Sequence, residues 1–280
     1  MQRVGRDLPP TTVHESRAAP EAVSCPPMKR FLNSVRNLSA WGSFWAQYYA
    51  LKQPGGAARE LEIPLRSGLV ALVPGVLMSA FDEVFLREVY ARSLSPPLRP
   101  APVVVDIGAN AGSFSLWVLS RHPDARVVAF EPLPSHVALL RRQSERNPGL
   151  DLTIDPRAVC AQRGPVQIRF DGRNEFSVAA SLFAREGADA SITVEATTLA
   201  DLFSEHDIDR CHLLKMDCEG AEYDILFGCP DEVFAATDRI VLEVHAWGQG
   251  TGNIEGLVRL LRGKGYRIMN RRNEILACSR

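Results

Sequence analysis

The sequence predicts an α/β fold in which a mostly parallel β-sheet carries helices on both faces. Beyond residue 102 of the 280-residue chain, short apolar runs alternate with segments in which apolar residues recur at helical spacing. This alternation is typical of strands joined by helical crossovers in a parallel sheet. The last two apolar runs are only three residues apart, which favours an antiparallel hairpin at one edge of the sheet.

The strands are predicted where apolar residues form short continuous runs. Residues 103–107 read Val-Val-Val-Asp-Ile, a pattern that suits burial on both faces of a sheet. Further strands are expected at residues 126–130, 150–154, 212–216, 239–244, 266–270 and 274–278, with residues 166–170 as a further strand at an edge. Helices are expected at residues 113–121, 134–147, 197–205, 221–227 and 254–264.

The part of the chain before this pattern differs from it in composition. Residues 1–27 are rich in Pro, Arg, Glu and Ser and are predicted to form a disordered tail. Residues 28–100 are predicted to form a helical extension, with an aromatic-rich helix at 29–52, a hairpin at 60–77 and a helix at 81–93. The aromatic stripe of the first helix favours packing on its own domain over docking on a membrane or partner. Residues 101–280 form the predicted α/β domain.

Composition excludes several classes of protein. The formal net charge is −1, so no basic excess points to nucleic-acid binding. The six cysteines contain no C-x-x-C pair and are expected to be reduced thiols without a zinc site. The most apolar window, residues 69–81, is too short to span a bilayer. We therefore expect a cytoplasmic protein without stable membrane insertion, whose oligomeric state the sequence leaves open.

The most informative motif is the glycine-rich turn that follows the first predicted strand. Asp106 ends the strand, and Gly108, Asn110 and Gly112 follow it before a predicted helix that contains Ser115. In an open α/β sheet, ligands bind at the carboxyl ends of the strands beside this turn. Glycine allows the backbone to approach a ligand closely. The turn therefore predicts a ligand site, with a tight turn that binds nothing as the alternative.

Glu131, at the end of the next predicted strand, indicates which kind of ligand binds there. An acid at this position can accept both hydroxyls of a ribose. A nicotinamide fingerprint needs G-x-G-x-x-G, but Asn110 and Ser113 stand where glycines are required. Asp106 would repel a pyrophosphate and suits a cationic ligand. S-adenosylmethionine has a sulfonium, an ammonium and a ribose, so it is the predicted cofactor.

A second cluster of ionisable residues follows two later strands at the same edge. Lys215, Asp217, Glu219 and Glu222 lie around the end of one strand, and His245 follows the next. Glu219 and Glu222 also suit a helix start, where acids are favoured without any catalytic role, and His245 also suits a strand end. Either His245 or Glu219 is the predicted general base, with Asp217 orienting and Lys215 pairing with an acid. These acids and His245 offer ligands for Mg²⁺, but no dedicated ligand spacing is visible, so no metal site is predicted.

The order and spacing of these motifs resemble the FkbM family of S-adenosylmethionine-dependent methyltransferases over residues 81–280. The resemblance is carried by VVDIGANAG (104–112), AFEP (129–132), TLADL (198–202), LKMDCEGAE (214–222) and LEVH (242–245). It implies a Rossmann-like class I methyltransferase fold with a seven-stranded, mostly parallel sheet, a C-terminal antiparallel hairpin and a helical N-terminal extension. It also implies that the cofactor contacts are Asp106, Gly108, Asn110, Gly112, Ser115, Glu131, Pro132, Ala158 and Val159.

The resemblance further implies that Asp217, Glu219 and His245 face the transferred methyl group and that the acceptor is a hydroxyl of a sugar, polysaccharide or natural product. We therefore expect an O-methyltransferase that acts on a small-molecule or glycan acceptor, with the two predicted helices of the extension as a lid. Two alternatives remain open at this point: a nicotinamide-dependent oxidoreductase on a related doubly wound fold, and a cofactor-binding module without catalytic activity.

Overall fold

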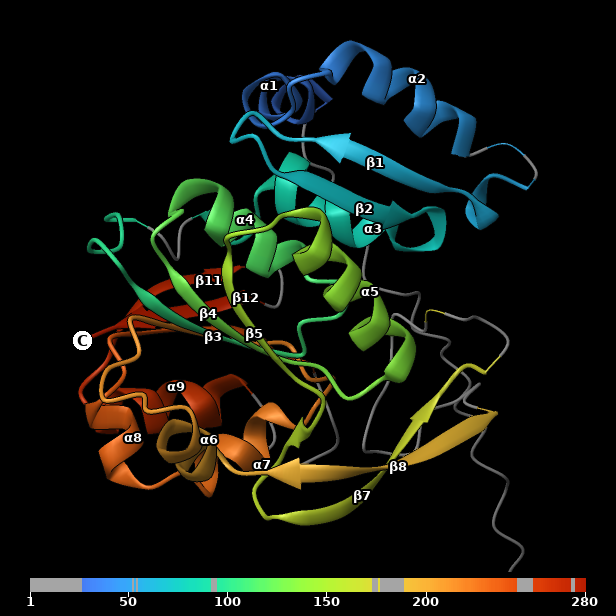
Figure 1. The fold of residues 1–280 in the computed structure, drawn as a ribbon. Helices are drawn as coiled ribbons and strands as arrows, with labels where there is room; N and C mark the ends of the chain where they lie inside the picture. Colours follow the sequence, from blue (N-terminus) through green and yellow to red (C-terminus); the bar gives the residue numbers. More distant parts are fainter. Residues whose placement is uncertain are drawn as a thin grey trace, which may run out of the picture.

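The core of the computed structural model is a seven-stranded sheet (Figure 1) with the order β11-β12-β10-β9-β3-β4-β5. The structure describes residues 27–51, 53, 55–91, 95–172, 176, 189–245, 254–272 and 275–280. Five strands are parallel, and β12 is antiparallel to both of its neighbours. This confirms the predicted sheet and its C-terminal hairpin. The strands are β3 (Val103–Ile107), β4 (Arg126–Phe130), β5 (Asp151–Asp155), β9 (Leu213–Met216), β10 (Arg239–Glu243), β11 (Arg267–Arg272) and β12 (Ile275–Ser279).

Helices cover both faces of this sheet. One face carries α4 (Ser113–Arg121) and α5 (Pro134–Arg146). The opposite face carries α6 (Leu199–Glu205), α7 (Glu222–Phe227), α8 (Asp231–Ala235) and α9 (Ile254–Gly263). The first two strand–helix units, β3–α4 and β4–α5, and the strand β5 begin and end within one residue of the predicted bounds. Helix α8 was not predicted, because five residues are too few to show helical periodicity.

The strand predicted at residues 166–170 is present and lies at an edge, but of a separate sheet rather than of the main one. It belongs to β7 (Gly164–Phe170), which pairs with β8 (Ala190–Thr197) in a separate three-stranded sheet that β6 (Ala158–Val159) completes. Side chains of β8 alternate between half-buried and exposed along most of its length. Because only one face of β8 is covered, its sequence lacks the continuous apolar run by which the buried strands were predicted.

The N-terminal extension begins with two helices, α1 (Pro27–Asn37) and α2 (Trp41–Leu51), where a single helix was predicted. The helix ends because Leu38 pairs with Leu65 in an isolated bridge and the Ser39 N–H donates to the Pro64 carbonyl at 3.0 Å. The predicted hairpin is confirmed as β1 (Glu60–Pro64) and β2 (Val70–Pro74). The predicted tail at residues 1–27 lies outside the described residues, apart from its last residue, which begins α1.

The second helix predicted in the extension is also interrupted. The helix expected at residues 81–93 is instead α3 (Met78–Phe81) followed by a π-helical turn, Asp82–Arg87. Glu88 ends this turn with a left-handed backbone, φ 51°. Two short 3₁₀ turns, Gly56–Ala58 and Gly75–Leu77, flank the hairpin.

Part of the aromatic stripe packs on the domain and part faces outward. Phe44 and Tyr48 of α2 are buried in one apolar cluster with Phe81, Phe114 and Trp117, so α2 shares a core with α4. In contrast, the stripe leaves several large side chains exposed at the surface: Phe31, Leu32, Trp41 and Tyr49. Packing on the same domain, as predicted, therefore accounts for part of the stripe.

Ion pairs fix the extension to the domain. Glu88, which is buried, accepts a hydrogen bond from Arg121 of α4 at 2.7 Å and pairs with Arg36 of α1. Asp82, also buried, pairs with Arg30 of α1 at 2.7 Å and with Arg87 at 3.0 Å. These contacts place the segment from Asp82 to Glu88 firmly between α1 and α4.

Two side-chain amides, one in the last turn of α5 and one directly after it, hold the hairpin on the domain. The side chain of Gln143 accepts from the Leu72 N–H at 2.9 Å and donates to the Leu72 carbonyl at 3.0 Å. One turn later, the Asn147 side chain makes the same pair of bonds to Val70, at 2.7 and 2.8 Å. The two amides therefore make the hydrogen bonds to the outer edge of β2 that another strand would otherwise make.

Replacing Gln143 with methionine tests this contact. The change keeps the volume of the side chain but leaves the buried N–H and carbonyl of Leu72 without partners. Each unpaired group costs about 1–3 kcal/mol, so we expect the free energy of unfolding to fall by about 2–4 kcal/mol. Urea denaturation measures this change. The matched control is Arg142→Met on the adjacent, exposed position, which loses only a surface ion pair with Glu60 and should cost about 1 kcal/mol or less. Equal losses in the two variants would contradict this account of Gln143.

Candidate active site

A cavity that is partly open to solvent lies at the carboxyl ends of β3, β4 and β9. This is the edge at which open α/β sheets bind ligands. Among the predicted cofactor residues, those that line it are Gly108, Asn110, Glu131, Pro132, Ala158 and Val159. Asp106, Gly112 and Ser115 are not among the described residues that line it. The structure therefore brings two thirds of the predicted set together around one cavity.

The turn between β3 and α4 has a backbone that requires glycine. Gly108 has φ 70°, and a Cβ atom placed on it would lie 1.9 Å from the carbonyl oxygen of Asp217. The loop after β3 therefore runs in direct contact with the loop after β9. Gly112 has φ 82°, and a Cβ there would lie 2.5 Å from the Leu140 side chain on α5. Gly112 thus serves the packing of the turn on α5.

Glu131 is 5% exposed and is held in place by backbone amides. Its Oε2 accepts from the N–H of Asn110 at 2.8 Å, and its Oε1 accepts from the N–H of Leu133 at 2.9 Å. The Nδ1 atom of His136 lies 3.6 Å from Oε1. Because each carboxylate oxygen has a second lone pair, the fixed Glu131 retains acceptor capacity toward the cavity.

The remaining wall of the cavity is largely apolar. It combines the end of β4 with β6 and β7, through side chains that include Phe130, Leu133, Val159 and Ile168. Ala158 and Val159 are buried at 5% and 4% exposure and lie beside β8 in the three-stranded sheet. An apolar slot next to a fixed carboxylate matches the adenosyl part of S-adenosylmethionine, which has a flat base and a ribose. The residues present therefore fit this cofactor.

Asp106 and Lys215 form a buried ion pair behind the cavity. The Nζ atom of Lys215 lies 3.1 Å from Oδ1 of Asp106 and donates to the Gly108 carbonyl at 2.7 Å. Ser115 donates to Oδ2 of Asp106 at 2.7 Å. Burial lowers the pKa of Lys215, but the carboxylates of Asp106 and Asp217 outweigh it, so the pKa is raised overall. The cationic partner of Asp106 in the structure is therefore Lys215 rather than a ligand.

Asp217 and Glu219 line the polar end of the cavity, and His245, which is not among its described lining residues, lies beside both. The Nε2 atom of His245 lies 3.7 Å from Oε2 of Glu219 and 3.9 Å from Oδ1 of Asp217, and its Nδ1 lies 3.4 Å from Oε1 of Glu222. Burial lowers the pKa of His245, but the hydrogen bond to Glu222 and the charges of Glu219, Glu222 and Asp217 raise it to about 9. The imidazole therefore carries its proton at neutral pH.

Glu222 has the structural role that the sequence analysis left open. It is fully buried, and its two oxygens accept the N–H groups of Cys218 at 2.8 Å and Gly220 at 2.9 Å. These bonds shape the loop between β9 and α7, in which Glu219 has a left-handed backbone with φ 51°. The loop turns the Glu219 side chain into the lining of the cavity.

The sequence analysis missed a further carboxylate, Glu243, at the end of β10. Its Oε2 accepts from the hydroxyl of Tyr90 at 3.1 Å. Burial and the charges of Asp217 and Glu83 raise the pKa of Glu243 to about 8. Burial, followed by the charge of Asp217, also raises the pKa of Glu83. Glu243 was visible in the LEVH motif, whereas nothing local in the sequence pointed to Glu83 or Tyr90.

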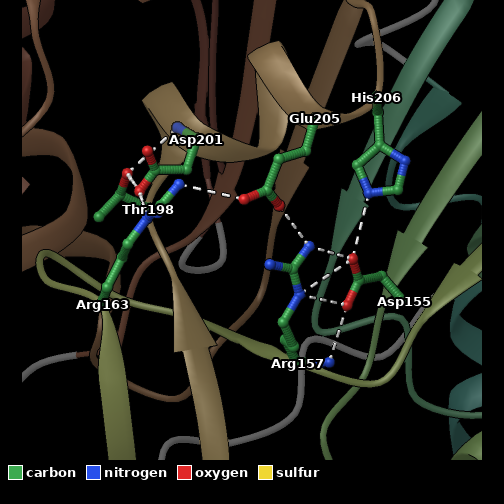
Figure 2. Close-up of polar contacts among 7 residues, drawn as sticks. All are labelled: Asp155, Arg157, Arg163, Thr198, Asp201, Glu205 and His206. Carbon is green, nitrogen blue, oxygen red and sulfur yellow. Dashed lines mark hydrogen bonds and ion pairs between the residues drawn. The ribbon is translucent and has the colours of Figure 1, made fainter.

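Arg157, which lines the cavity, was also missed. Figure 2 shows its guanidinium between Asp155 and Glu205, with Nη2 donating to Oδ2 of Asp155 at 2.6 Å and lying 2.7 Å from Oε2 of Glu205. His206 contacts the same Asp155 at 3.1 Å, and Arg163 pairs with Glu205 at 3.1 Å. This network crosses from β5 to α6 and fixes Arg157 at one wall of the cavity.

Comparison with known proteins identifies the family. The profile described as "Methyltransferase FkbM domain" matches residues 106–268, which is more than half of the chain. The AMB antimetabolite synthetase AmbE of Pseudomonas aeruginosa is 33% identical over 257 residues, covering 77% of this chain but only 12% of AmbE. The chain thus spans a small part of that relative.

Two further relatives are of a size closer to this chain. The 31-O-demethyl-FK506 methyltransferase FkbM of Streptomyces tacrolimicus is 28% identical over 244 residues, covering 78% of this chain and 92% of FkbM. The 2-O-methyltransferase NoeI of Sinorhizobium fredii is 29% identical over 143 residues, covering 46% of this chain and 58% of NoeI.

The family match excludes both alternatives, the nicotinamide-dependent oxidoreductase and the module without catalytic activity. With the fold, the cavity and the profile in agreement, the chain belongs to the FkbM methyltransferase-domain family and is an S-adenosylmethionine-dependent methyltransferase.

Proposed function

We propose that this methyltransferase transfers its methyl group to a hydroxyl oxygen of a sugar, polysaccharide or other natural product. The observation that carries the proposal is the position of Asp217 and Glu219 at the polar end of the cavity, which Glu131 and the apolar slot also line, with His245 beside them. A hydroxyl needs a proton acceptor as it attacks, and this wall offers one. The relatives named for 31-O and 2-O methylation support the choice of oxygen.

The cofactor contacts divide into two groups in this proposal. Glu131 accepts the ribose hydroxyls, and Asn110 and Pro132 border the sugar. Ala158 and Val159 contact the adenine, and Arg157 adds a polar group to that wall. Gly108 lets the backbone approach the cofactor, whereas Asp106, Gly112 and Ser115 act from behind by holding the turn in shape.

The charges around His245 indicate which residue takes each catalytic role. The bound cofactor supplies an electrophilic methyl group on its sulfonium. His245 is surrounded by three carboxylates and holds its proton, so Glu219 is the better candidate for the base that takes the hydroxyl proton. Asp217 orients the acceptor, and Lys215 holds Asp106. Correct placement of the hydroxyl alone can contribute about 7–11 kcal/mol to the rate.

We restrict the proposed lid to a smaller part of the N-terminal extension. Residues 28–100 remain an extension of the domain at 101–280 in this proposal. Among its described residues, Glu83 and Tyr90 border the acceptor side: the Tyr90 hydroxyl donates to Glu243, and burial and the charge of Asp217 raise the pKa of Glu83. Helices α1 and α2 lie on the far side of the β1–β2 hairpin from α4 and α5 (Figure 1), so we assign them a packing role. Among the described residues, no helix is long and apolar enough to cross a membrane.

Glu131→Gln tests the cofactor site. The amide keeps the size of the side chain but removes the charge that strengthens two hydrogen bonds to the ribose. Since a hydrogen bond to a charged group contributes about 1.5–3 kcal/mol, affinity for S-adenosylhomocysteine should fall roughly 10- to 100-fold. Calorimetric titration measures it. Glu145→Gln, on the exposed side of α5, is the control and should bind like the parent chain. Unchanged binding in Glu131→Gln would remove Glu131 from the ribose site.

Glu219→Gln tests the base. With methyl-labelled S-adenosylmethionine and a panel of glycosides and other alcohols, mass spectrometry identifies acceptors that gain a methyl group. For such an acceptor we expect Glu219→Gln to lower kcat on the order of 100- to 10,000-fold, because the amide cannot take the proton. The affinity for S-adenosylhomocysteine should change little. Methylation of amines or carboxylic acids, with no alcohol accepted, would contradict the proposed O-methylation.

A further inference from the structure

We propose that Asp217, Glu243 and His245 bind a divalent metal ion beside the polar end of the cofactor cavity, which Asp217 lines. One potential ligand atom from each residue lies within 4.8 Å of the other two. Metal–oxygen distances are about 2.0–2.6 Å for Mg²⁺ and Ca²⁺, so donors of a single ion lie within roughly 4–5 Å of one another. The three side chains therefore stand at the spacing that one ion requires.

The fold places these three residues together by strand register. Strands β9 and β10 are parallel, with Leu242 opposite Met216. Asp217 and Glu243 are the next residues on the two strands, so they end their strands side by side. His245 follows two residues after Glu243. The three residues therefore stand at the ends of two adjacent strands in the middle of the sheet.

A contact on the far side of the imidazole is an independent sign of a metal ligand. Glu222, which is fully buried and fixed by two backbone amides, lies 3.4 Å from Nδ1 of His245. Histidines that bind metals through one ring nitrogen commonly donate the other ring N–H to a carboxylate, which orients the ring. This leaves Nε2, the nitrogen nearer to Asp217, as the donor to an ion, which displaces the Nε2 proton to solvent when it binds.

The charges around Asp217 and Glu243 also favour a bound cation. The side chain of Asp217 has no hydrogen bond to any described residue, and its nearest cations are Lys215 Nζ at 3.8 Å and His245 Nε2 at 3.9 Å. Lys215 is closer to Asp106, at 3.1 Å. Glu243 receives the Tyr90 hydroxyl on one oxygen. A divalent ion would balance the two carboxylates that the strand register brings together.

Two carboxylates and one imidazole, all half-buried, suit an ion of the Mg²⁺ or Mn²⁺ class, which keeps several positions for water or substrate oxygens. Such an ion would bind and orient an oxygen-rich acceptor next to the methyl group. That role rests on the proposed function, whereas binding of the ion itself does not.

The test uses Mn²⁺ as the probe and the purified full chain. Titration followed by electron paramagnetic resonance should show one saturable site per chain, and the spin echo of bound Mn²⁺ should show coupling to an imidazole nitrogen. We expect Glu243→Gln to weaken Mn²⁺ binding at least tenfold and His245→Gln to abolish the nitrogen coupling. Asp151→Asn, an exposed acid at the start of β5, is the control and should bind like the parent chain.

Titration of each variant with S-adenosylhomocysteine shows that the variant is folded. If Glu243→Gln does not bind S-adenosylhomocysteine and is therefore misfolded, the ion site is tested by the loss of nitrogen coupling in His245→Gln alone. No saturable binding at millimolar Mn²⁺, or binding that Glu243→Gln and His245→Gln both leave unchanged, would overturn the ion site without touching the methyltransferase proposal. Mn²⁺ binding as described, together with no methylation of any alcohol, would leave the site standing and overturn the proposed acceptor.

Discussion

The buried pair of Asp106 and Lys215 is the interaction on which the rest of the site depends. The two residues are direct neighbours in the register of β3 and β9, and neither is more than 3% exposed. Lys215 also donates to the carbonyl of Gly108, so one ammonium group joins both strands to the turn that follows β3. A buried charge without a partner is strongly destabilising, and each of these residues therefore depends on the other.

The two strand-end loops are built against each other as a consequence. Gly108 touches the backbone of Asp217 so closely that no side chain fits between them, and Glu222 binds the amides that shape the loop holding Glu219. The loop after β3 forms one wall of the cofactor cavity and the loop after β9 forms its polar end. The cofactor pocket and the polar wall are thus two sides of a single packed unit.

The features that sequence reasoning predicted are those encoded locally. Continuous apolar runs identified β3 and β4, and the order of acids after them placed Glu131, Asp217 and Glu219 at one edge. What it missed depends on contacts between distant segments. Tyr90 reaches Glu243 across 153 positions, and the helix break at Leu38 arises from pairing with Leu65. No local pattern distinguishes such residues from ordinary surface or core positions.

The most direct measurement of this account is a double-mutant cycle on the buried pair, Asp106→Asn and Lys215→Met, alone and together, read by urea unfolding and by binding of S-adenosylhomocysteine. The account predicts that each single change lowers the free energy of unfolding by about 3–5 kcal/mol and weakens binding, and that the double variant loses clearly less than the sum of the two. Additive losses, or single variants that bind S-adenosylhomocysteine like the parent chain, would contradict it.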